Sequence, residues 1–182
     1  VHRRPNKNAA MNLFPYADSS VRPAIPGDEV VVAQIQLGAW RDQPALGDDI
    51  VELIDPDAVV TAWRDAITTP PSDRHRVLIA CEGATPVGFA AITPAEVIAL
   101  EVAADHQRSG HGSRLMSACV DHLRNFGAQT VSVWVIDGDD ARVAFLTSAG
   151  FQPEGIARTL ASADPDDPAA HTIREVRYGA AL

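Results

Sequence analysis

Apolar residues along this chain recur at two alternating periods, one typical of helices and the other of strands. Steps of three and four residues predict helices over 28–40, 56–68, 112–126 and 140–149. Short apolar runs bounded by Gly, Pro or Asp predict strands over 20–23, 76–81, 87–93, 96–103, 130–135, 156–161 and 172–178. Helices and strands therefore interleave in a mixed α/β order, without an internal repeat or a second domain.

The first residues differ from the rest of the chain. Residues 1–19 contain Arg3, Arg4 and Lys7 but no apolar stretch behind them, so they lack the layout of a secretory signal. We expect a flexible leader over 1–19 and one domain over 20–182. No apolar run approaches the ~20 residues that a membrane span needs. We therefore expect a cytoplasmic protein that does not associate with membranes.

The turn Gln107–Ser113, which reads Q-R-S-G-H-G-S, carries the strongest functional signal. An apolar strand precedes it, and a helix with Leu115, Cys119 and Leu123 on one face follows. A glycine-rich turn at a helix N-terminus presents unpaired backbone N–H groups at the positive end of the helix dipole. The pattern thus predicts a phosphate site formed by the main chain.

Two other glycine-rich motifs do not fit this turn. A dinucleotide fingerprint requires a third small residue where Leu115 stands, and a P-loop requires Gly-Lys-Ser/Thr, which the chain lacks. Lys7 is the single lysine, so the predicted domain cannot form a Schiff base.

Three segments together resemble the GCN5-related N-acetyltransferases (GNAT family). The turn matches the family's pyrophosphate loop, Q-x-x-G-x-G; residues 131–151, ending in Gly150-Phe151, match its next strand and helix; and Val21-Arg22-Pro23 resembles its opening. The resemblance covers about 21–178 and implies an α/β (mixed α+β) GNAT fold. That fold is a mostly antiparallel, splayed sheet of six to seven strands, flanked by about four helices. It also implies an acyl-CoA-dependent N-acyltransferase, in which a primary amine directly attacks the thioester of acetyl-CoA.

The resemblance assigns cofactor-binding roles to a strand, the turn and a later helix. The residues are Leu100, Val102, Ala103, Gln107, Arg108, Ser109, Gly110, His111, Gly112, Ser113, Asp139 and Phe145. Amides of 108–113 would hold the pyrophosphate, and main-chain groups of 100–103 would bind pantetheine. The Val102 N–H would face the thioester carbonyl, where negative charge develops. Asp139 replaces an Asn that is common in the family, and a helix N-cap is the simpler role for it.

A carboxylate beside the thioester could accept the proton of the attacking amine. Glu101 is the candidate catalytic base, and Glu96 is a weaker alternative. Strand alternation directs Glu101 away from Leu100 and Val102. The alternative role for Glu101 is an ordinary side chain that faces solvent or a salt bridge.

The usual general acid of the family is absent. A Tyr normally follows the position of Phe145, and Leu146 stands there instead. A thiol with a pKa near ~8.5 can leave without protonation, and Tyr178, Ser148 or a water could replace the missing donor. The same difference favours an alternative function, a non-catalytic or sensory module that binds acyl-CoA.

Charge narrows the choice of partners. The formal net charge is −9, although four of the basic residues lie within the first 22 positions, so a nucleic acid would be repelled. Residues 41–57 contain six carboxylates against Arg41 alone. These carboxylates either cap helices in solvent or attract a cationic acceptor, such as a small amine, a polyamine, an aminoglycoside or a peptide N-terminus. The family resemblance also makes a homodimer possible.

The cysteines and histidines do not indicate a metal. Cys81 and Cys119 are predicted to be buried, free thiols, and no Cys/His cluster shows metal-binding spacing. His106 and His111 are five positions apart, and we expect neither to be a metal ligand.

The tryptophans fall into two groups. Trp40 and Trp63 lie on the predicted inward faces of helices and are expected in the core. Trp134 lies on the strand across the expected splay, where either packing or substrate contact is possible.

Overall fold

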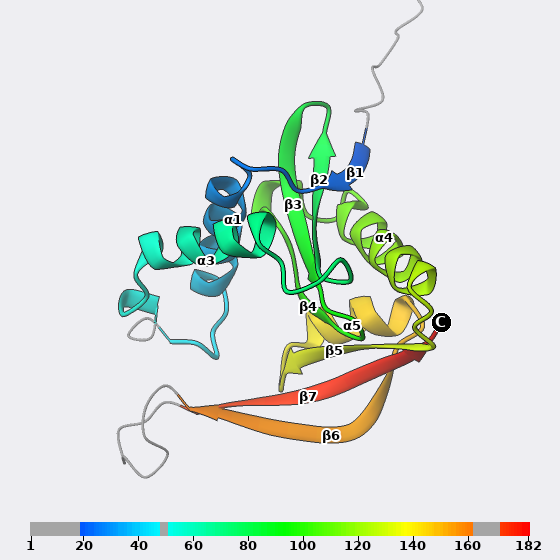
Figure 1. Ribbon diagram of the computed structural model, residues 1–182. Helices are drawn as coiled ribbons and strands as arrows, with labels where there is room; N and C mark the ends of the chain where they lie inside the picture. Colours follow the sequence, from blue (N-terminus) through cyan, green and yellow to red (C-terminus); the bar gives the residue numbers. More distant parts are fainter. Residues whose placement is uncertain (1–18, 48–50, 162–171) are drawn as a thin grey trace, which may run out of the picture.

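The computed structural model describes residues 19–47, 51–161 and 172–182. Strands and helices alternate in these residues as the periodicity predicts (Figure 1). In chain order they are β1 (Ser19–Pro23), α1 (Glu29–Arg41), α3 (Pro56–Thr68), β2 (Arg76–Glu82), β3 (Thr85–Ile92), β4 (Val97–Val102), the 3-10 helix η1 (Ala104–His106), α4 (His111–Asn125), β5 (Thr130–Ile136), α5 (Asp140–Ser148), β6 (Gln152–Ala161) and β7 (Thr172–Ala181).

The strands form two sheets that separate from each other. One sheet has the order β1-β2-β3-β4 and the other β5-β7-β6, and neighbours within each are antiparallel. Among the described residues, β4 and β5 are linked by an isolated parallel bridge between Glu96 and Ser132. The Ser132 N–H donates to the Ala95 carbonyl at 3.0 Å beside this bridge. The predicted splayed, mostly antiparallel sheet is therefore confirmed.

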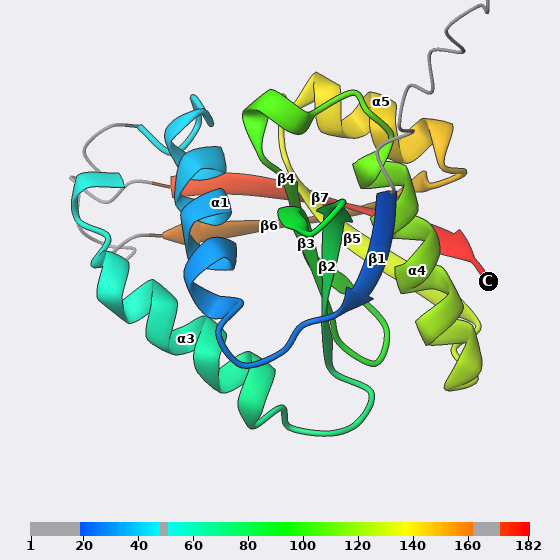
Figure 2. The same cartoon turned by 90° about the horizontal axis from the view of Figure 1, so that it is seen from above.

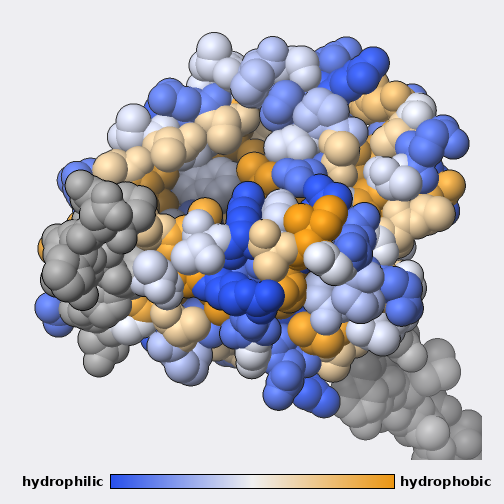
Figure 3. Space-filling model, turned by 90° about the horizontal axis from the view of Figure 1, so that it is seen from below, coloured by the Kyte–Doolittle hydropathy of each residue, from blue (hydrophilic) through white to orange (hydrophobic). Residues whose placement is uncertain are grey.

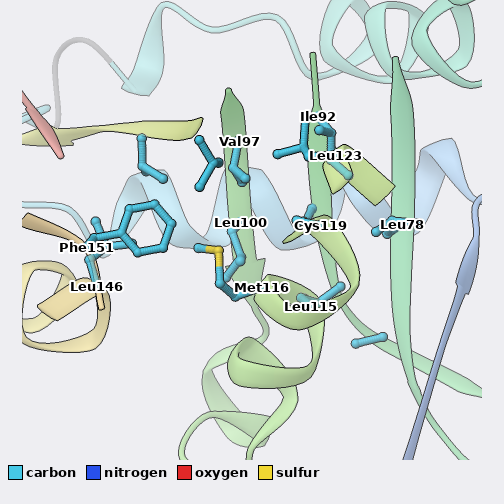
Figure 4. Packing of buried hydrophobic residues seen from close by; sticks show 14 of the residues in the cluster. Leu78, Ile92, Val97, Leu100, Leu115, Met116, Cys119, Leu123, Leu146 and Phe151 are labelled. Atoms are coloured by element: carbon cyan, nitrogen blue, oxygen red, sulfur yellow. The ribbon is translucent and has the colours of Figure 1, made fainter. Parts of the chain in front are cut away.

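One core lies between the first sheet and α4. The helix α4 presents Leu115, Met116, Cys119 and Leu123 to the strands (Figure 4). Phe151 and Leu146, at the end of α5, extend the same cluster. Fully burying a side chain of this size contributes about 1.5–3 kcal/mol, so this face of α4 holds the helix on the sheet.

A second core lies on the opposite face of the first sheet. Helices α1 and α3 cover that face, while α4 lies on the other side (Figure 2). The rings of Trp63 and Phe89 meet edge to face at 5.0 Å between centroids, and Trp63 Nε1 donates to Gln36 Oε1 at 2.7 Å. The prediction of Trp63 as a core residue is confirmed.

Several boundaries differ from the predictions. The strand β4 ends at Val102, one residue before the predicted end at 103, and η1 begins at Ala104. The strand β6 begins at Gln152, four residues before the predicted start at 156, because an irregularity in its pairing between Pro153 and Ala157 hides the alternation.

Both cysteines are buried and free, as predicted. Burial raises the pKa of the Cys119 thiol to about 12, so this group stays protonated. The proposed leader lies outside the described residues, apart from Ser19 in β1. None of the helices in the described ranges is long and apolar enough to cross a membrane.

Candidate active site

The predicted phosphate-binding turn has the backbone conformation that such a site requires. Two of its residues lie in the left-handed region, Arg108 with a φ of 61° and Gly110 with a φ of 84°. α4 begins at the next residue, His111. Left-handed positions in a turn allow successive N–H groups to converge on an anion, and the helix N-terminus adds its positive dipole end. The predicted glycine-rich turn and the helix start therefore coincide.

Side chains hold this turn against β4. Gln107 Nε2 donates to the Val102 carbonyl at 3.2 Å, and Arg114 Nη1 donates to the Ser109 carbonyl at 3.2 Å. The Gln107 side chain therefore positions the turn, which leaves the backbone amides to serve a ligand.

The first turn of α4 also contacts two other residues predicted to bind the cofactor. A Cβ added at Gly112 would lie 3.6 Å from Phe145 Cε2 and 3.9 Å from Leu100 Cδ2. The structure thus brings the turn, β4 and α5 together. Ala103, another predicted residue, follows β4 directly.

The outer edge of β4 presents main-chain groups toward the gap between the sheets. The Ala103 N–H donates to the Val87 carbonyl on β3 at 2.9 Å. Since hydrogen bonds alternate along an antiparallel pair, Leu100 and Val102 direct their N–H and C=O groups away from β3. The Leu100 carbonyl accordingly accepts a hydrogen bond from Arg142 Nη1 at 2.6 Å. The Val102 N–H, the expected thioester donor, points in the same direction.

A pocket of about 230 Å³ occupies the space where the sheets separate. Side chains from α1, β4, β5, α5 and β7 line it, among them Trp40, Glu101, Trp134, Arg142 and Glu175. Seen from below, the surface of the molecule is hollowed beside a group of strongly hydrophilic side chains (Figure 3). We call the pocket lined by these side chains the splay pocket.

A second pocket of about 340 Å³ adjoins the splay pocket along β4. It lies between α1 and the segment Val102–Gln107. The two pockets meet β4 at successive positions, because Glu101 lines the first and Val102 the second. A path along β4 therefore runs from the turn past Val102 to Glu101.

Glu101 forms an ion pair with Arg142 across the gap. Arg142 Nη2 donates to Glu101 Oε1 at 2.7 Å and to Oε2 at 2.9 Å. Burial raises the pKa of Glu101, and the neighbouring positive charge of Arg142 offsets part of that rise. The Glu101 side chain keeps 21% of its surface exposed, so it remains accessible from the pocket. A salt bridge was the alternative role considered for Glu101 in the sequence, and the pair with Arg142 is such a salt bridge.

Asp139 caps α5, the simpler of the two roles considered for it. Its Oδ1 accepts from the Arg142 N–H at 2.9 Å, and its Oδ2 accepts from Gln43 Nε2 at 3.1 Å. These bonds fix the start of α5, which carries Arg142 toward Glu101. Asp139 also lines the splay pocket.

The position of the usual acid is buried. Leu146 is 1% exposed and packs in the core that contains α4. Ser148 Oγ donates to the Phe145 carbonyl at 2.7 Å, and Tyr178 packs against the same core. Among the described residues lining the two pockets, none is a serine or a tyrosine.

Glu96 forms the bridge between the sheets, and its side chain bonds to β5. Its Oε1 accepts from Ser132 Oγ and from Trp134 Nε1, both at 3.3 Å. Glu96 lines neither pocket, so its contacts favour Glu101 as the base.

The two tryptophans of the splay pocket differ in their surroundings. Arg158 lies over the Trp134 ring, 4.1 Å from its centroid, and Glu96 holds the indole N–H. Trp134 is therefore a fixed wall. Trp40 is only half-buried and lines the same pocket, so the prediction that it belongs to the core is wrong.

The acidic segment 41–57 contributes little to the splay pocket. Asp55 caps α3, where its Oδ1 accepts from the Asp57 N–H at 3.0 Å, and Asp42 lines the second pocket. Asp48 and Asp49 lie outside the described residues.

Sequence reasoning missed two features of this region. Arg142, the partner of Glu101, follows Glu101 by 41 positions, and its spacing from Asp139 indicates only a helix cap. Glu82 lies beside His106 and His111, which the sequence considered as a pair alone. No local pattern connects residues from such distant elements.

Comparison with known proteins supports the fold. A GCN5-related N-acetyltransferase from Rhodopseudomonas palustris is 22% identical, with 90% of this chain and 95% of that chain covered and a TM-score of 0.68. A putative acetyltransferase from Salmonella typhimurium, yncA, solved with its cofactor acetyl-CoA, is 19% identical over 90% and 94% of the chains, with a TM-score of 0.66. The PaiA N-acetyltransferase from Thermoplasma acidophilum, solved with coenzyme A, is 14% identical over 90% and 99%, with a TM-score of 0.71.

No curated protein matches the chain. The family model for the acetyltransferase (GNAT) family matches residues 38–151, which include β4, the turn, α4 and α5. Because this match spans more than half of the chain, the protein belongs to the acetyltransferase (GNAT) family.

Proposed function

We propose that this protein transfers the acetyl group of acetyl-CoA to a cationic primary amine, with Glu101 as the general base. One observation carries the proposal: the Glu101 carboxylate and the outward main-chain groups of Val102 follow one another at the end of β4, and the turn 107–113 lies just beyond. Such a path matches a cofactor that has phosphates at one end and a reactive thioester at the other.

The residues present fit acetyl-CoA at each end of this path. Backbone amides of 108–113 would hold the pyrophosphate, as the left-handed Arg108 and Gly110 allow. The Val102 N–H would donate to the thioester oxygen, where negative charge grows during attack. The thioester itself supplies the activated acyl group.

Glu101 is placed to accept the proton that the amine must lose. Each oxygen of an ionised carboxylate has two acceptor positions, so the bonds from Arg142 leave room for a proton. The carboxylate takes one proton from the ammonium group and passes it to water, and the neutral nitrogen then bonds to the acyl carbon. The carbon–sulfur bond breaks, the thiolate leaves, and the nitrogen gives its second proton to the Glu101 carboxylate. The raised pKa of Glu101 brings its basicity closer to neutral pH, where general-base catalysis is most effective.

The splay pocket favours a positively charged acceptor. Among the described lining residues, the carboxylates are Glu101, Asp139 and Glu175 and the cation is Arg142, while Arg158 pairs with Glu175 from outside the lining. The Trp40 ring adds an aromatic surface that attracts ammonium groups. With a volume of about 230 Å³, the pocket suits a small amine or the terminal amine of a longer molecule.

Release of free thiol from acetyl-CoA, measured over a panel of amines, tests this proposal. The panel includes diamines, polyamines, aminoglycosides and peptides with free N-termini. We expect release that depends on a cationic amine and forms the corresponding amide. Absence of release with every amine, when coenzyme A binding is intact, would contradict the catalytic function.

A second candidate is a sensory or non-catalytic acyl-CoA-binding module. The buried Leu146, in the position of the usual acid, favours it, as does the absence of serine and tyrosine among the described pocket residues. Calorimetry with acetyl-CoA alongside the thiol assay distinguishes the two, since this module would bind the thioester without releasing thiol.

A further inference from the structure

Three side chains capable of binding a metal meet beside the phosphate-binding turn. Glu82 ends β2, His106 ends η1, and His111 begins α4. One ligand atom from each lies within 4.8 Å of the other two. α4 packs against β1 and β2, which explains how residues distant in sequence converge here (Figure 2).

The environment of His111 needs an explanation. This side chain is 2% exposed, and its Nδ1 is buried without a hydrogen-bond partner in the described part of the chain. Buried polar atoms are almost always paired, and an unpaired one costs about 1–3 kcal/mol. One ring nitrogen of this buried imidazole lies in the cluster with another imidazole and a carboxylate, and its unpaired Nδ1 points to a missing partner.

The ion pair between Glu82 and His106 does not supply that partner. His106 Nδ1 lies 2.7 Å from Glu82 Oε2, whereas the two imidazole rings are 6.3 Å apart between centroids. Hydrogen bonding therefore accounts for two members of the cluster and leaves the buried third one unexplained.

Two imidazoles and one carboxylate form a donor set that zinc and similar divalent transition metals prefer. Bonds of about 2.0–2.1 Å in a tetrahedral site would place the ligand atoms about 3.3–3.5 Å apart. The observed limit of 4.8 Å requires only small side-chain rotations to reach this geometry. Glu82 and His106 keep 36% and 31% of their side-chain surface exposed, so an ion can enter from solvent.

We propose that Glu82, His106 and His111 bind a divalent transition metal ion of the zinc class, with solvent at the remaining coordination position. The two histidines flank residues 107–110, so the ion would hold together the two ends of the phosphate-binding turn. From the sequence we expected neither histidine to be a metal ligand. That expectation rested on the spacing of His106 and His111 and did not consider Glu82. None of the three ligand side chains is the proposed base, but His106 lines the second pocket and His111 begins α4, so the site adjoins the proposed cofactor path.

Titration calorimetry with Zn²⁺ on the full 182-residue chain tests the site. We expect one ion per chain with a Kd of about 1 μM or tighter, since three protein ligands converge. His106→Ala and Glu82→Gln should each weaken that affinity at least about tenfold, because even indirect partners of a metal contribute 10–100-fold. Both side chains are partly exposed, so these variants should fold, and unchanged far-UV circular dichroism checks this.

His122→Ala is the matched control, because His122 lies on α4 outside the cluster, with Nε2 at 3.3 Å from the Arg74 carbonyl. This variant should keep the affinity of the original chain. Co²⁺ in place of Zn²⁺ should give the visible absorption of a four- or five-coordinate ion, and His106→Ala should change that spectrum. Absence of Zn²⁺ binding, or binding that Glu82→Gln and His106→Ala leave unchanged, would overturn the proposal.

Discussion

Glu101 combines two influences that act on its pKa in opposite directions. Burial favours the neutral acid, whereas Arg142 favours the carboxylate, and burial is the larger influence. The unfolded chain therefore releases this proton at a lower pH than the folded protein does. As pH rises from about 4.5 through the folded pKa, the contribution of Glu101 to stability falls. Ionising the buried Glu101 carboxylate therefore lowers the stability of the folded protein, and the proposed catalytic role gives a reason for keeping this residue.

Glu101→Gln should slow acyl transfer by about 10²–10⁴-fold, because the amide cannot accept the proton of the amine. Binding of coenzyme A should change little, since the amide oxygen still accepts a hydrogen bond from Arg142. The original enzyme should lose activity as pH falls through the raised pKa of Glu101, and the variant should lack that dependence. Steady-state rates between pH 5 and pH 9 (roughly the range around neutrality in which a raised carboxyl pKa becomes visible) measure both effects.

Glu96→Gln is the control for this substitution, because Glu96 lies on the same sheet edge but lines neither pocket. Its amide can still accept the bonds from Ser132 and Trp134, so activity should stay close to that of the original enzyme. Full turnover in Glu101→Gln at every pH would show that another group accepts the proton.

Gly110→Val should weaken binding of coenzyme A about tenfold or more. Gly110 has a φ of 84°, which a β-branched residue adopts only with strain, and an added Cβ would lie 2.9 Å from Arg114 Nη1. The turn would then shift, and its amides would no longer converge on the phosphates. Calorimetry with coenzyme A measures this change.

Gly127→Val provides the matched control, because Gly127 has a similar φ of 77° and follows the opposite end of α4. Both variants should lose comparable stability, but only the change in the turn should lower affinity for coenzyme A. Equal affinity in the two variants would show that the phosphates bind elsewhere.

At the scale of single residues, the sequence was informative where a role depends on local backbone geometry. The cap at Asp139 and the glycine-rich turn before α4 follow from neighbouring residues and were predicted. Arg142 and Glu82 act through partners on distant elements, which local spacing cannot show. Trp40 lies on an amphipathic helix, and its apolar neighbours gave no sign that this position borders a pocket.

At the scale of elements, agreement was best where a helix has a clear start signal. The helix α3 spans 56–68 as predicted, because Pro56 and the cap at Asp55 define its beginning. Prediction was poorest at β6, where Pro153 and Gly155 obscure alternation at an irregular pairing. The separation of β4 from β5 came from the family resemblance, since each strand alone has an ordinary apolar pattern.

The pairing of β3 with β4 supports the part of β4 that faces the cofactor path. Gly88 lies opposite Val102, and an added Cβ would be 2.8 Å from the Glu101 carbonyl and 3.2 Å from Val102 Cγ2. Gly88→Ala should therefore push β4 outward, with a loss of stability of about 1–3 kcal/mol and a lower kcat. Denaturant unfolding and steady-state kinetics measure the two quantities.

Gly38→Ala is the control for stability, because Gly38 lies in α1 with nothing within 4 Å of an added Cβ. This change should raise stability by about 0.5–1 kcal/mol, as alanine is the better helix former. If Gly88→Ala were as stable and active as the original chain, the close approach of β3 to β4 would have no role at the site.

At the scale of the whole molecule, one core joins residues of both sheets, and the sheets separate beyond the bridge between Glu96 and Ser132. Beyond that bridge, the gap places groups from α1, β4, β5, α5 and β7 around one pocket. The chain as a whole has a net charge of −9, so the long-range field and the lining of the pocket have the same sign. A cationic acceptor should therefore be attracted from a distance and also bound at the pocket.

This field predicts that kcat/KM for a diamine, at saturating acetyl-CoA, falls about three- to tenfold as ionic strength rises from ~0.01 M to ~0.15 M. The Debye length shortens from about 30 Å to about 8 Å over this range, so the attraction is screened. An aromatic amine that is neutral at the assay pH is the control, and its kcat/KM should change much less. Saturation with acetyl-CoA removes the salt dependence of cofactor binding from the comparison. Equal salt dependence for the two amines would show that the acidic surroundings do not select the acceptor.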